Sequence, residues 1–171
     1  MMIRECKTSD KSLIFEIIND AATVYKGVIP TDRYHEPYMP MDELEKEIAD
    51  GISFFCYEEN SILIGVMGFQ DKGEVSLIRH AYVRTQHQNA GIGQQLLNFL
   101  KEKTEKPILI GTWADANWAI RFYRKNGFAP VNKKEKNKLL KKYWNIPLKQ
   151  IETSIVLADS KWRGENLKER P

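Results

Sequence analysis

The clearest pattern of apolar positions in this chain is a strand followed by a helix. Apolar residues alternate through residues 75–83, which is the period of a half-buried strand, and Arg79 alone interrupts the row. A four-residue apolar period over residues 92–100 then predicts the buried face of a helix. Gly91 and Gly93 lie between the two elements. A strand, a glycine turn and a helix together direct backbone N–H groups at an anion, so the pattern predicts a phosphate-bearing ligand.

The same two periods predict the remaining elements. The predicted strands are residues 2–6, 52–57, 61–69, 107–113 and 151–157, and the predicted helices are residues 13–26, 41–50, 118–125 and 133–143. Residues 58–60 suit a tight turn, so the second and third strands should form an antiparallel hairpin. Three prolines exclude a continuous helix over residues 28–40. Asp115 or Asn117 can cap the helix that follows.

Length and composition place the chain among ordinary globular proteins. Its 171 residues predict one domain over residues 1–158, and residues 159–171 lack periodicity and read as a flexible tail. The net charge of +3 is too small to indicate nucleic acid. The N-terminus has no apolar signal-peptide core, no run is long enough to cross a membrane, and Cys6 and Cys56 stand far apart in sequence. We therefore expect a cytoplasmic protein with reduced cysteines.

Three kinds of phosphate-binding turn can follow such a strand. A P-loop requires Gly-x-x-x-x-Gly-Lys-Ser/Thr, which this sequence lacks. A dinucleotide fingerprint requires a third glycine, but this chain has Leu96 at that position. The fingerprint also requires an acidic residue at the end of the next strand, and this sequence has none there. The acyl-CoA motif Gln/Arg-x-x-Gly-x-Gly/Ala is met in full by Gln88-Asn-Ala-Gly-Ile-Gly93. Because that motif is short, a plain strand-to-helix turn stays open at this point.

A second segment makes the acyl-CoA motif more specific. Residues 117–128 are similar to Asn-x-x-Ala/Gly-x-x-Phe-Tyr-x-x-x-Gly-Phe, with one residue fewer between Asn117 and Ala119. The two motifs, in this order, resemble the GNAT superfamily of N-acetyltransferases, and the order of the predicted elements extends the resemblance over most of the chain. The resemblance implies an α/β fold with a mixed, mostly antiparallel central sheet and helices on both faces. It also implies acetyl-CoA as co-substrate.

The resemblance assigns the coenzyme to particular backbone groups. In this family the central strand splays from its neighbour and pairs with the pantetheine arm, a role that falls here to Ala81, Tyr82 and Val83. One N–H of that strand would polarise the thioester carbonyl. The pyrophosphate would lie against the N–H groups of Gln88, Asn89, Ala90, Gly91, Ile92, Gly93 and Gln94. Asn117 would bond the pantetheine arm, cap its own helix, or do both.

Two positions in this segment depart from the family's usual residues. Asn89 stands where the family often has glycine, and asparagine is one of the few residues that tolerate a left-handed backbone. Thr85 stands where the family often has proline, so we expect it to loosen the turn slightly.

The resemblance also implies a general acid. Tyr123 occupies the family's position for this group, and a phenol with a pKa near ~10 can protonate a thiolate whose pKa is near ~8.5. Without the motif, an aromatic residue packed in the core beside Phe122 would be the simpler interpretation. His80, with Glu36 or His35, could take the proton of the attacking amine, although a structural strand histidine is an equal alternative.

The acceptor site is predicted in the proline-rich loop, since family members place it between the first two helices. Tyr34, Glu36 and Tyr38 are the candidate contacts there, or else they only anchor the loop. The glutamates of the helix over residues 41–50, which include Glu43 and Glu47, read as a solvated face. The three histidines show no ligand spacing, so no metal is expected.

These inferences predict direct transfer of an acetyl group from acetyl-CoA to a primary amine of a small molecule or peptide. A non-catalytic CoA-binding or partner-docking module on the same fold is the alternative. The lysine-rich residues 133–142 favour a solvated helix face over a nucleic-acid surface, because the rest of the chain offsets their charge. We expect no membrane and no nucleic acid as partners, and a homodimer is an open expectation because the family often forms dimers.

Overall fold

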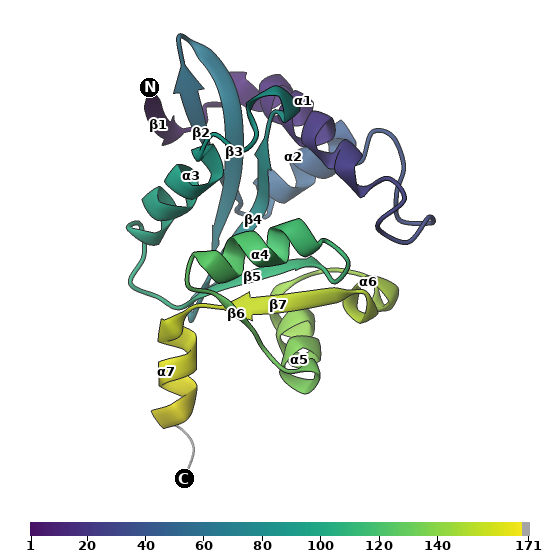
Figure 1. The fold of residues 1–171 in the computed structure, drawn as a ribbon, viewed down its shortest axis with the longest axis vertical. Helices are drawn as coiled ribbons and strands as arrows, with labels where there is room; N and C mark the ends of the chain where they lie inside the picture. The colour runs from purple at the N-terminus through teal and green to yellow at the C-terminus, as the bar shows by residue number, and fades with distance from the viewer. Residues whose placement is uncertain (169–171) are drawn as a thin grey trace. The chain divides into compact units, whose positions relative to one another are not determined.

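A computed structural model describes the backbone of residues 1–168 and the side chains of residues 1–164 (Figure 1). The strands are β1 (Met2–Glu5), β2 (Ser53–Glu59), β3 (Ile62–Asp71), β4 (Ser76–Val83), β5 (Ile108–Trp113), β6 (Ala129–Pro130) and β7 (Ser154–Ala158). The α-helices are α1 (Lys11–Ala21), α2 (Met41–Ala49), α3 (Ile92–Lys101), α4 (Asn117–Lys125), α5 (Lys133–Tyr143), α6 (Leu148–Glu152) and α7 (Ser160–Lys168). Short 3-10 helices are η1 (Thr8–Asp10), η2 (Ala22–Tyr25) and η3 (Thr85–His87).

The strands hydrogen-bond in the order β1-β2-β3-β4-β5-β7-β6. The pairs β1/β2, β2/β3, β5/β7 and β6/β7 are antiparallel. Asn60 and Ser61 connect β2 to β3 with left-handed φ angles of 51° and 64°, as a two-residue hairpin turn requires. The predicted α/β fold with a mostly antiparallel sheet is therefore confirmed.

The chain divides into two compact units, which are described in turn. The first contains residues 1–71 and 78–105, and the second contains residues 72–77 and the chain from residue 106 onward.

In the first unit, helices cover both faces of the strands (Figure 1). Phe54 of β2 is buried against α1 and α2, in a cluster that includes Ile17 and Leu44. Phe55 points to the opposite face, because side chains alternate along a strand, and it packs against Phe99 of α3 with 5.8 Å between ring centroids. The apolar periods of α1, α2 and α3 are thus explained by burial on two faces of the same strands.

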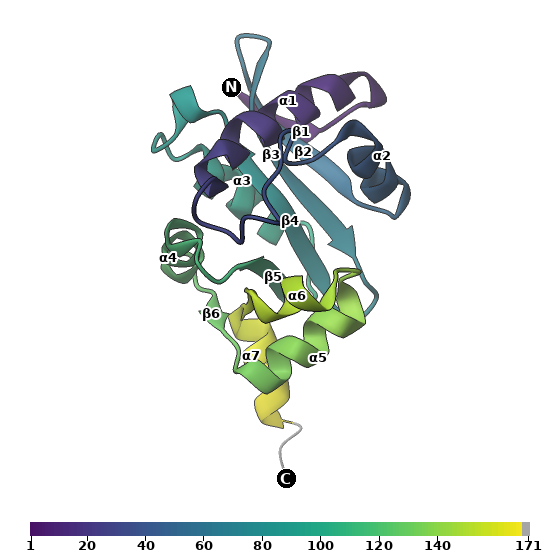
Figure 2. The same cartoon turned by 90° about the vertical axis from the view of Figure 1, so that its right-hand side faces the viewer.

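In the second unit, α5 and α6 pack on one side of β5 and β7, and α4 lies on the other side (Figures 1 and 2). The buried cluster joins Leu139 of α5 and Ile151 of α6 to Leu109 of β5 and Val156 of β7. Gly111 of β5 lets Trp144, which follows α5, pack close to the strand.

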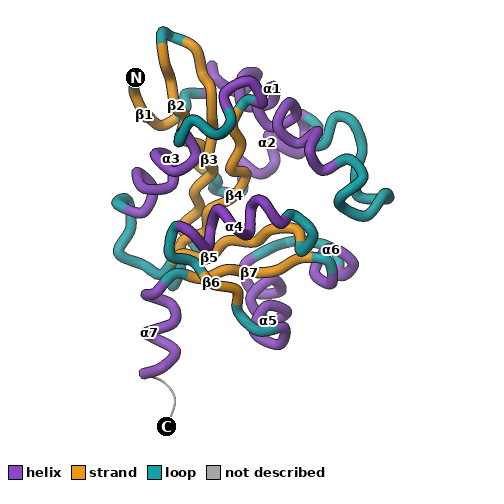
Figure 3. The backbone as a smooth tube through the Cα atoms, viewed as in Figure 1, coloured by secondary structure: helices purple, strands orange, loops and turns teal. Residues whose placement is uncertain are grey.

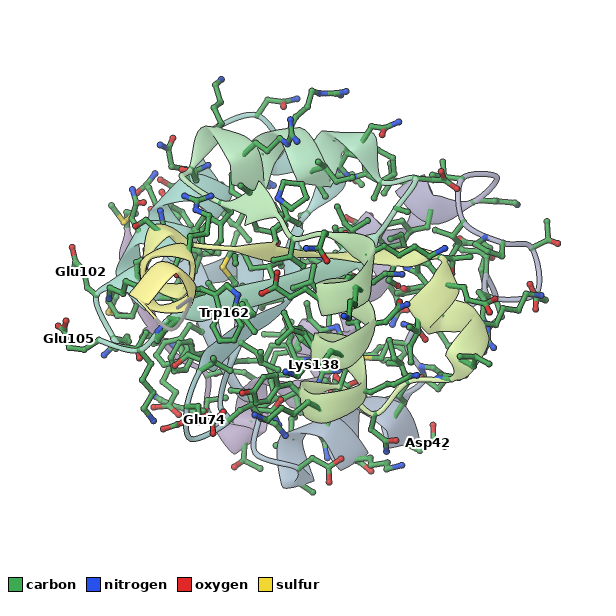
Figure 4. All side chains as sticks on the ribbon, turned by 90° about the horizontal axis from the view of Figure 1, so that it is seen from below. Asp42, Glu74, Glu102, Glu105, Lys138 and Trp162 are labelled. Carbon is green, nitrogen blue, oxygen red and sulfur yellow. The ribbon has the colours of Figure 1, made fainter. Side chains whose placement is uncertain are left out.

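The lysine-rich segment forms α5, as predicted (Figure 4). One of its lysines, Lys136, is only 6% exposed and donates a hydrogen bond of 2.7 Å to the carbonyl of Ile151. On the neighbouring α7, the indole N–H of Trp162 donates to the Glu135 carboxylate of α5 at 2.8 Å. Polar as well as apolar contacts therefore hold α5 in the second unit.

Two local expectations are corrected. The last strand was expected at residues 151–157, but α6 follows its N-cap Pro147 and buries Ile151, so the strand begins at Ser154. Neither Asp115 nor Asn117 caps α4, because the N-cap position is Ala116 and no side chain bonds there. Residues 159–171, expected to form a flexible tail, contain α7, and residues 169–171 lie outside the described part of the chain; the flexibility of this segment stays a prediction.

Candidate functional site

The turn after β4 has the backbone conformation that an anion site needs. Asn89 and Gly91 are both left-handed, with φ angles of 65° and 79°, and Gly91 is the N-cap of α3. The N–H of Gln95 makes the first helical bond, to the Gly91 carbonyl at 3.1 Å. The N–H groups of the three residues before it, 92–94, therefore point out of the helix start, where the helix dipole favours negative charge.

Side chains hold this turn to the body of the first unit. Thr85 donates its backbone N–H to Asp20 of α1 at 2.8 Å and its hydroxyl to the other carboxylate oxygen at 3.2 Å. The amide of Gln88 donates to the Val83 carbonyl at 3.3 Å. Thr85 thus anchors the segment and does not loosen it, because a proline there would lack the N–H that binds Asp20.

A glycine in β3 sets how closely α3 approaches the strands. A Cβ atom at Gly65 would lie 3.1 Å from Ile92, 3.3 Å from Leu96 and 3.3 Å from Val83. The absence of a side chain therefore brings the first turn of α3 against the end of β4. The same contact places the helix N-terminus beside Val83, one of the residues predicted to bind the coenzyme arm.

β4 is irregular at His80. This residue has a φ angle of 54°, which is left-handed and uncommon for a non-glycine residue in a strand. The Arg79 carbonyl beside it lies close to Gly68 of β3, where a Cβ would come within 2.7 Å of the oxygen. The strand therefore bulges immediately before Ala81, Tyr82 and Val83.

Two successive side chains of β4 reach one carboxylate of α2. Arg79 Nη2 lies 3.6 Å from Glu47 Oε1, and His80 Nε2 contacts Glu47 Oε2. The Glu47 side chain is only 16% exposed, so the expectation that it belongs to a solvated face is wrong. Its position three residues after the buried Leu44, on the same helix face, was the sequence signal for burial.

These contacts control the ionisation of Glu47. Burial by itself raises the pKa of the carboxyl, but the hydrogen bond and charge of His80 and the charge of Arg79 outweigh it and lower the pKa. Glu43, one turn earlier, has its pKa raised, first by burial and then by the charge of Glu47. The end of α2 therefore presents an ionised carboxylate to His80.

The proline-rich loop connects η2 to α2 (Figure 3), and a series of aromatic ring contacts joins it to Tyr82 of β4. Tyr34 stacks on Tyr38 with 6.4 Å between centroids, Tyr38 lies 5.1 Å from Tyr25, and Tyr25 meets Tyr82 edge-on at 6.4 Å. The Tyr34 hydroxyl also donates to Glu36 at 3.0 Å. The structure thus connects the three predicted acceptor residues to Tyr82 through Tyr25, a residue that belongs to no motif in the sequence.

The backbone of this loop is also fixed at its end. The Asn19 side chain of α1 accepts from the Met39 N–H at 2.9 Å and donates to the Met39 carbonyl at 3.0 Å. This pair of bonds satisfies both backbone groups of Met39 and holds the loop on α1.

The remaining predicted residues belong to the second unit. Tyr123 on α4 is 6% exposed and packs between Phe122 and Phe128, with centroid distances of 5.2 Å and 6.1 Å. Asn117, the first residue of α4, is exposed. The ring of Tyr123 is thus buried as the simpler interpretation predicted, while its assignment as general acid stays a prediction.

A surface hollow of about 430 Å³ in the first unit lies elsewhere. Its lining comes from the end of β1, η1, α1, α2 and β2, and includes Cys6, Lys11 and Glu45. None of the predicted site residues lines it, and the ion pair between Lys11 and Glu45, at 2.6 Å, spans it. The hollow is therefore separate from the candidate site.

Comparison with known families agrees with this geometry. Residues 50–130, which contain β2 through α4 and the glycine turn, match the family model described as an acetyltransferase (GNAT) domain. Residues 50–130 of the chain therefore belong to the GNAT superfamily.

Solved structures of other GNAT proteins share the fold. A GNAT-family acetyltransferase from Staphylococcus aureus Mu50 has a TM-score of 0.68 at 19% identity, over 92% of this chain and 97% of that one. The PaiA N-acetyltransferase of Thermoplasma acidophilum, in complex with coenzyme A, has a TM-score of 0.64 at 16% identity, over 92% and 97%. YncA of Salmonella typhimurium, with its cofactor acetyl-CoA, has a TM-score of 0.58 at 25% identity, over 77% and 81%.

In the part of the chain that the structure describes, no helix has the length and apolar character needed to span a membrane.

Proposed function

We propose that this protein transfers an acetyl group from acetyl-CoA directly to a primary amine of a small molecule or peptide. The observation that carries the proposal is the start of α3, where the left-handed Asn89 and Gly91 leave the N–H groups of residues 92–94 directed outward. Such a turn suits the pyrophosphate of a CoA ester. GNAT membership, and the coenzyme complexes of related structures, support the same assignment.

The residue roles follow the resemblance to the GNAT motifs. The backbone of Ala81, Tyr82 and Val83 would hold the pantetheine arm and thioester, beside the turn that would hold the pyrophosphate. Tyr123 would give its proton to the departing thiolate, and Asn117 would bond the pantetheine arm. We place these functions in one acetyltransferase domain over residues 1–158.

Direct transfer is favoured because neither cysteine offers an accessible thiolate. The hydrogen bond with Cys6 lowers the pKa of the Cys56 thiol, but Cys56 is fully buried and closed to an acyl donor. The hydrogen bond to Cys56 raises the pKa of the Cys6 thiol, and burial raises it further, so little reactive thiolate forms. An acyl-enzyme intermediate on either residue is therefore disfavoured.

The acceptor would approach the loop that carries Tyr34, Glu36 and Tyr38. A carboxylate beside aromatic rings attracts an ammonium group by charge and by the ring faces. The ring contacts through Tyr25 join this loop to Tyr82, so the acceptor amine would meet the strand that holds the thioester.

Two measurements test the proposal. Calorimetric titration should show binding of acetyl-CoA, and a thiol-release assay over a panel of amines should identify the acceptor. The Tyr123→Phe variant should keep its affinity for acetyl-CoA but lose about 100-fold or more in kcat. Tyr143→Phe is a matched control, because Tyr143 is also 6% exposed in the second unit but donates its hydroxyl to Glu74 at 2.7 Å.

The outcomes separate the alternatives. Absence of binding at millimolar acetyl-CoA would contradict the proposal outright. Binding without thiol release for any amine would support a CoA-binding or partner-docking module. Equal turnover in wild type and Tyr123→Phe would remove Tyr123 from the mechanism while leaving acetyl transfer intact.

A further inference from the structure

The contact between Glu47 and His80 is built by an irregular backbone. In a regular strand, neighbouring side chains point to opposite faces, so Arg79 and His80 could not reach the same group. Both reach Glu47, because the left-handed φ of 54° at His80 interrupts the alternation. A left-handed backbone is unfavourable for a non-glycine residue. The imidazole thus meets this carboxylate only through a strained backbone conformation.

The contact is secluded and specific. The side chains of His80 and Glu47 are 15% and 16% exposed. Among the described residues, His80 Nε2 and Glu47 Oε2 make no hydrogen bond to any third group. Phe54 of β2 lies against the imidazole at 27° with 6.1 Å between centroids, which fixes the plane of the ring. The carboxylate thus faces one nitrogen of an oriented imidazole.

The surrounding charges are defined. The titratable or charged groups around the pair are Arg79 of β4, Glu43, Lys46 and Asp50 at α2, and His35 of the loop over residues 26–40. Gln70 of β3 accepts from Arg79 at 3.3 Å. Arg79 balances one negative charge, and Glu43 adds another near the imidazole.

The position of His80 is suited to the reaction. It directly precedes Ala81, the first residue of the segment predicted to hold the thioester, and successive residues in a strand are about 3.3 Å apart. The charges of His80 and of His35, in the proline-rich loop, both bear on the Glu43 carboxyl. An amine held by that loop would meet His80 next to the acetyl group.

We propose that Glu47 is the positioning residue that makes His80 the proton acceptor for the attacking amine. This inference rests on the acetyl transfer proposed above. Nε2–H of His80 donates to Glu47, and the other ring nitrogen takes one proton from the substrate ammonium. The neutral amine then forms the new C–N bond, the C–S bond breaks, and Tyr123 protonates the thiolate. The second proton of the attacking nitrogen leaves through water and restores the Tyr123 phenol. Glu47 stabilises the imidazolium until it releases its proton to water.

The test compares pH profiles of kcat/KM in the full chain, using thiol release at saturating acetyl-CoA. Glu47→Gln should lower kcat about 10-fold to 100-fold, because the base is no longer oriented. In this variant, the fall of kcat/KM on the acidic side of the profile (the acid limb) should occur at lower pH. The reason is that an imidazolium without the carboxylate loses its proton more readily. Glu47→Asp, which keeps the charge, should restore part of the rate and the position of the limb. Glu45→Gln, on the same helix but paired with Lys11, is the matched control and should match wild type.

A double variant shows whether the two residues act together. Glu47→Gln combined with His80→Gln should be no slower than His80→Gln alone. The proposal would be overturned if the rate loss of the double variant equalled the product of the two single losses. It would also be overturned if the acid limb of Glu47→Gln stayed at the wild-type pH. Thermal unfolding of each variant identifies any loss of fold, and in that case the Glu47→Asp profile decides.

A readout without turnover keeps this test separate from the proposed function. NMR of histidine-labelled protein, with the His80 signals assigned from His80→Gln, follows the imidazole titration directly. The His80 midpoint should fall in Glu47→Gln and stay unchanged in Glu45→Gln. If wild type binds acetyl-CoA but acetylates no amine, the proposed function fails, and a shifted midpoint still supports the Glu47–His80 coupling. An unshifted midpoint overturns the coupling itself.

Discussion

Replacing Gly68 by alanine tests whether β3 and β4 approach as closely as the bulge at His80 requires. The new Cβ would lie 2.7 Å from the Arg79 carbonyl oxygen and 3.0 Å from the side chain of Ile52. Ordinary contact begins at 3.4 Å, so the Arg79 backbone would have to retreat by about 0.7 Å. Because the clash is with backbone, no side-chain rotation can relieve it.

The expected cost is that of overpacking a well-packed interior, about 1–3 kcal/mol. That is a substantial part of a total stability of roughly 5–15 kcal/mol, and each kcal/mol should lower Tm by about 2–4 °C in a chain of this size. Urea unfolding followed by circular dichroism measures the free energy. Acetyl transfer should fall as well, because the shift displaces Arg79 and His80.

Gly164→Ala is the matched control for this prediction. Gly164 lies inside α7, and a Cβ there would meet nothing within 4 Å. The substitution should leave stability unchanged or raise it by up to about 1 kcal/mol, because alanine favours helix. If Gly68→Ala unfolded with a free energy within about 0.5 kcal/mol of wild type, the close approach of the two strands would be refuted.

Three further predictions concern the turn, the N-terminal ion pair and the buried lysine. Gly91→Ala should lower the free energy of unfolding by about 1–2 kcal/mol and weaken acetyl-CoA binding in calorimetry. Gly127→Ala, also at a left-handed position, is the control and should lower stability without weakening the binding. Equal losses of acetyl-CoA affinity in the two variants would contradict the anion site. The hydrogen bond from Arg4 lowers the pKa of Asp10, so its stabilisation is present above about pH 4 and is lost as the pH falls through the lowered pKa. The difference in unfolding free energy between wild type and Asp10→Asn should therefore shrink below pH 4, and a constant difference down to pH 2 would argue against the pair. Lys136→Met should lower the free energy of unfolding, measured in urea, by about 1–3 kcal/mol, because the Ile151 carbonyl loses its hydrogen-bond donor. Lys134→Met, at an exposed position of the same helix, should change it little. A similar effect for both variants would show that the buried hydrogen bond is unimportant.

Local features of this protein could be predicted from the sequence because neighbouring residues determine them. The alternation over residues 75–83 and the four-residue period over 92–100 predicted β4 and α3, and the structure confirms both. The left-handed conformation at Asn89 followed from the few residue types that tolerate it. Two motifs in order indicated the GNAT superfamily before any contact was known.

Local patterns failed where another part of the chain competed. Residue 151 looked like the start of a strand, yet a helix follows Pro147 and the cluster with α5 buries Ile151. Thr85 looked like a loosened position, yet Asp20, 65 residues earlier, binds both its N–H and its hydroxyl. Neither partner is visible in the residues nearby.

The sequence by itself determined the fold class, the superfamily and the glycine turn that we propose to hold the coenzyme pyrophosphate. These depend on periodicity, on left-handed tolerance and on motif spacing, all of which are properties of short segments. The tertiary structure was needed to show that the half-buried Glu47 contacts His80 and that Tyr25 joins the proline-rich loop to Tyr82. Those contacts depend on how α2 packs and where β4 bulges, because residues distant in sequence meet only after the strands and helices have assembled.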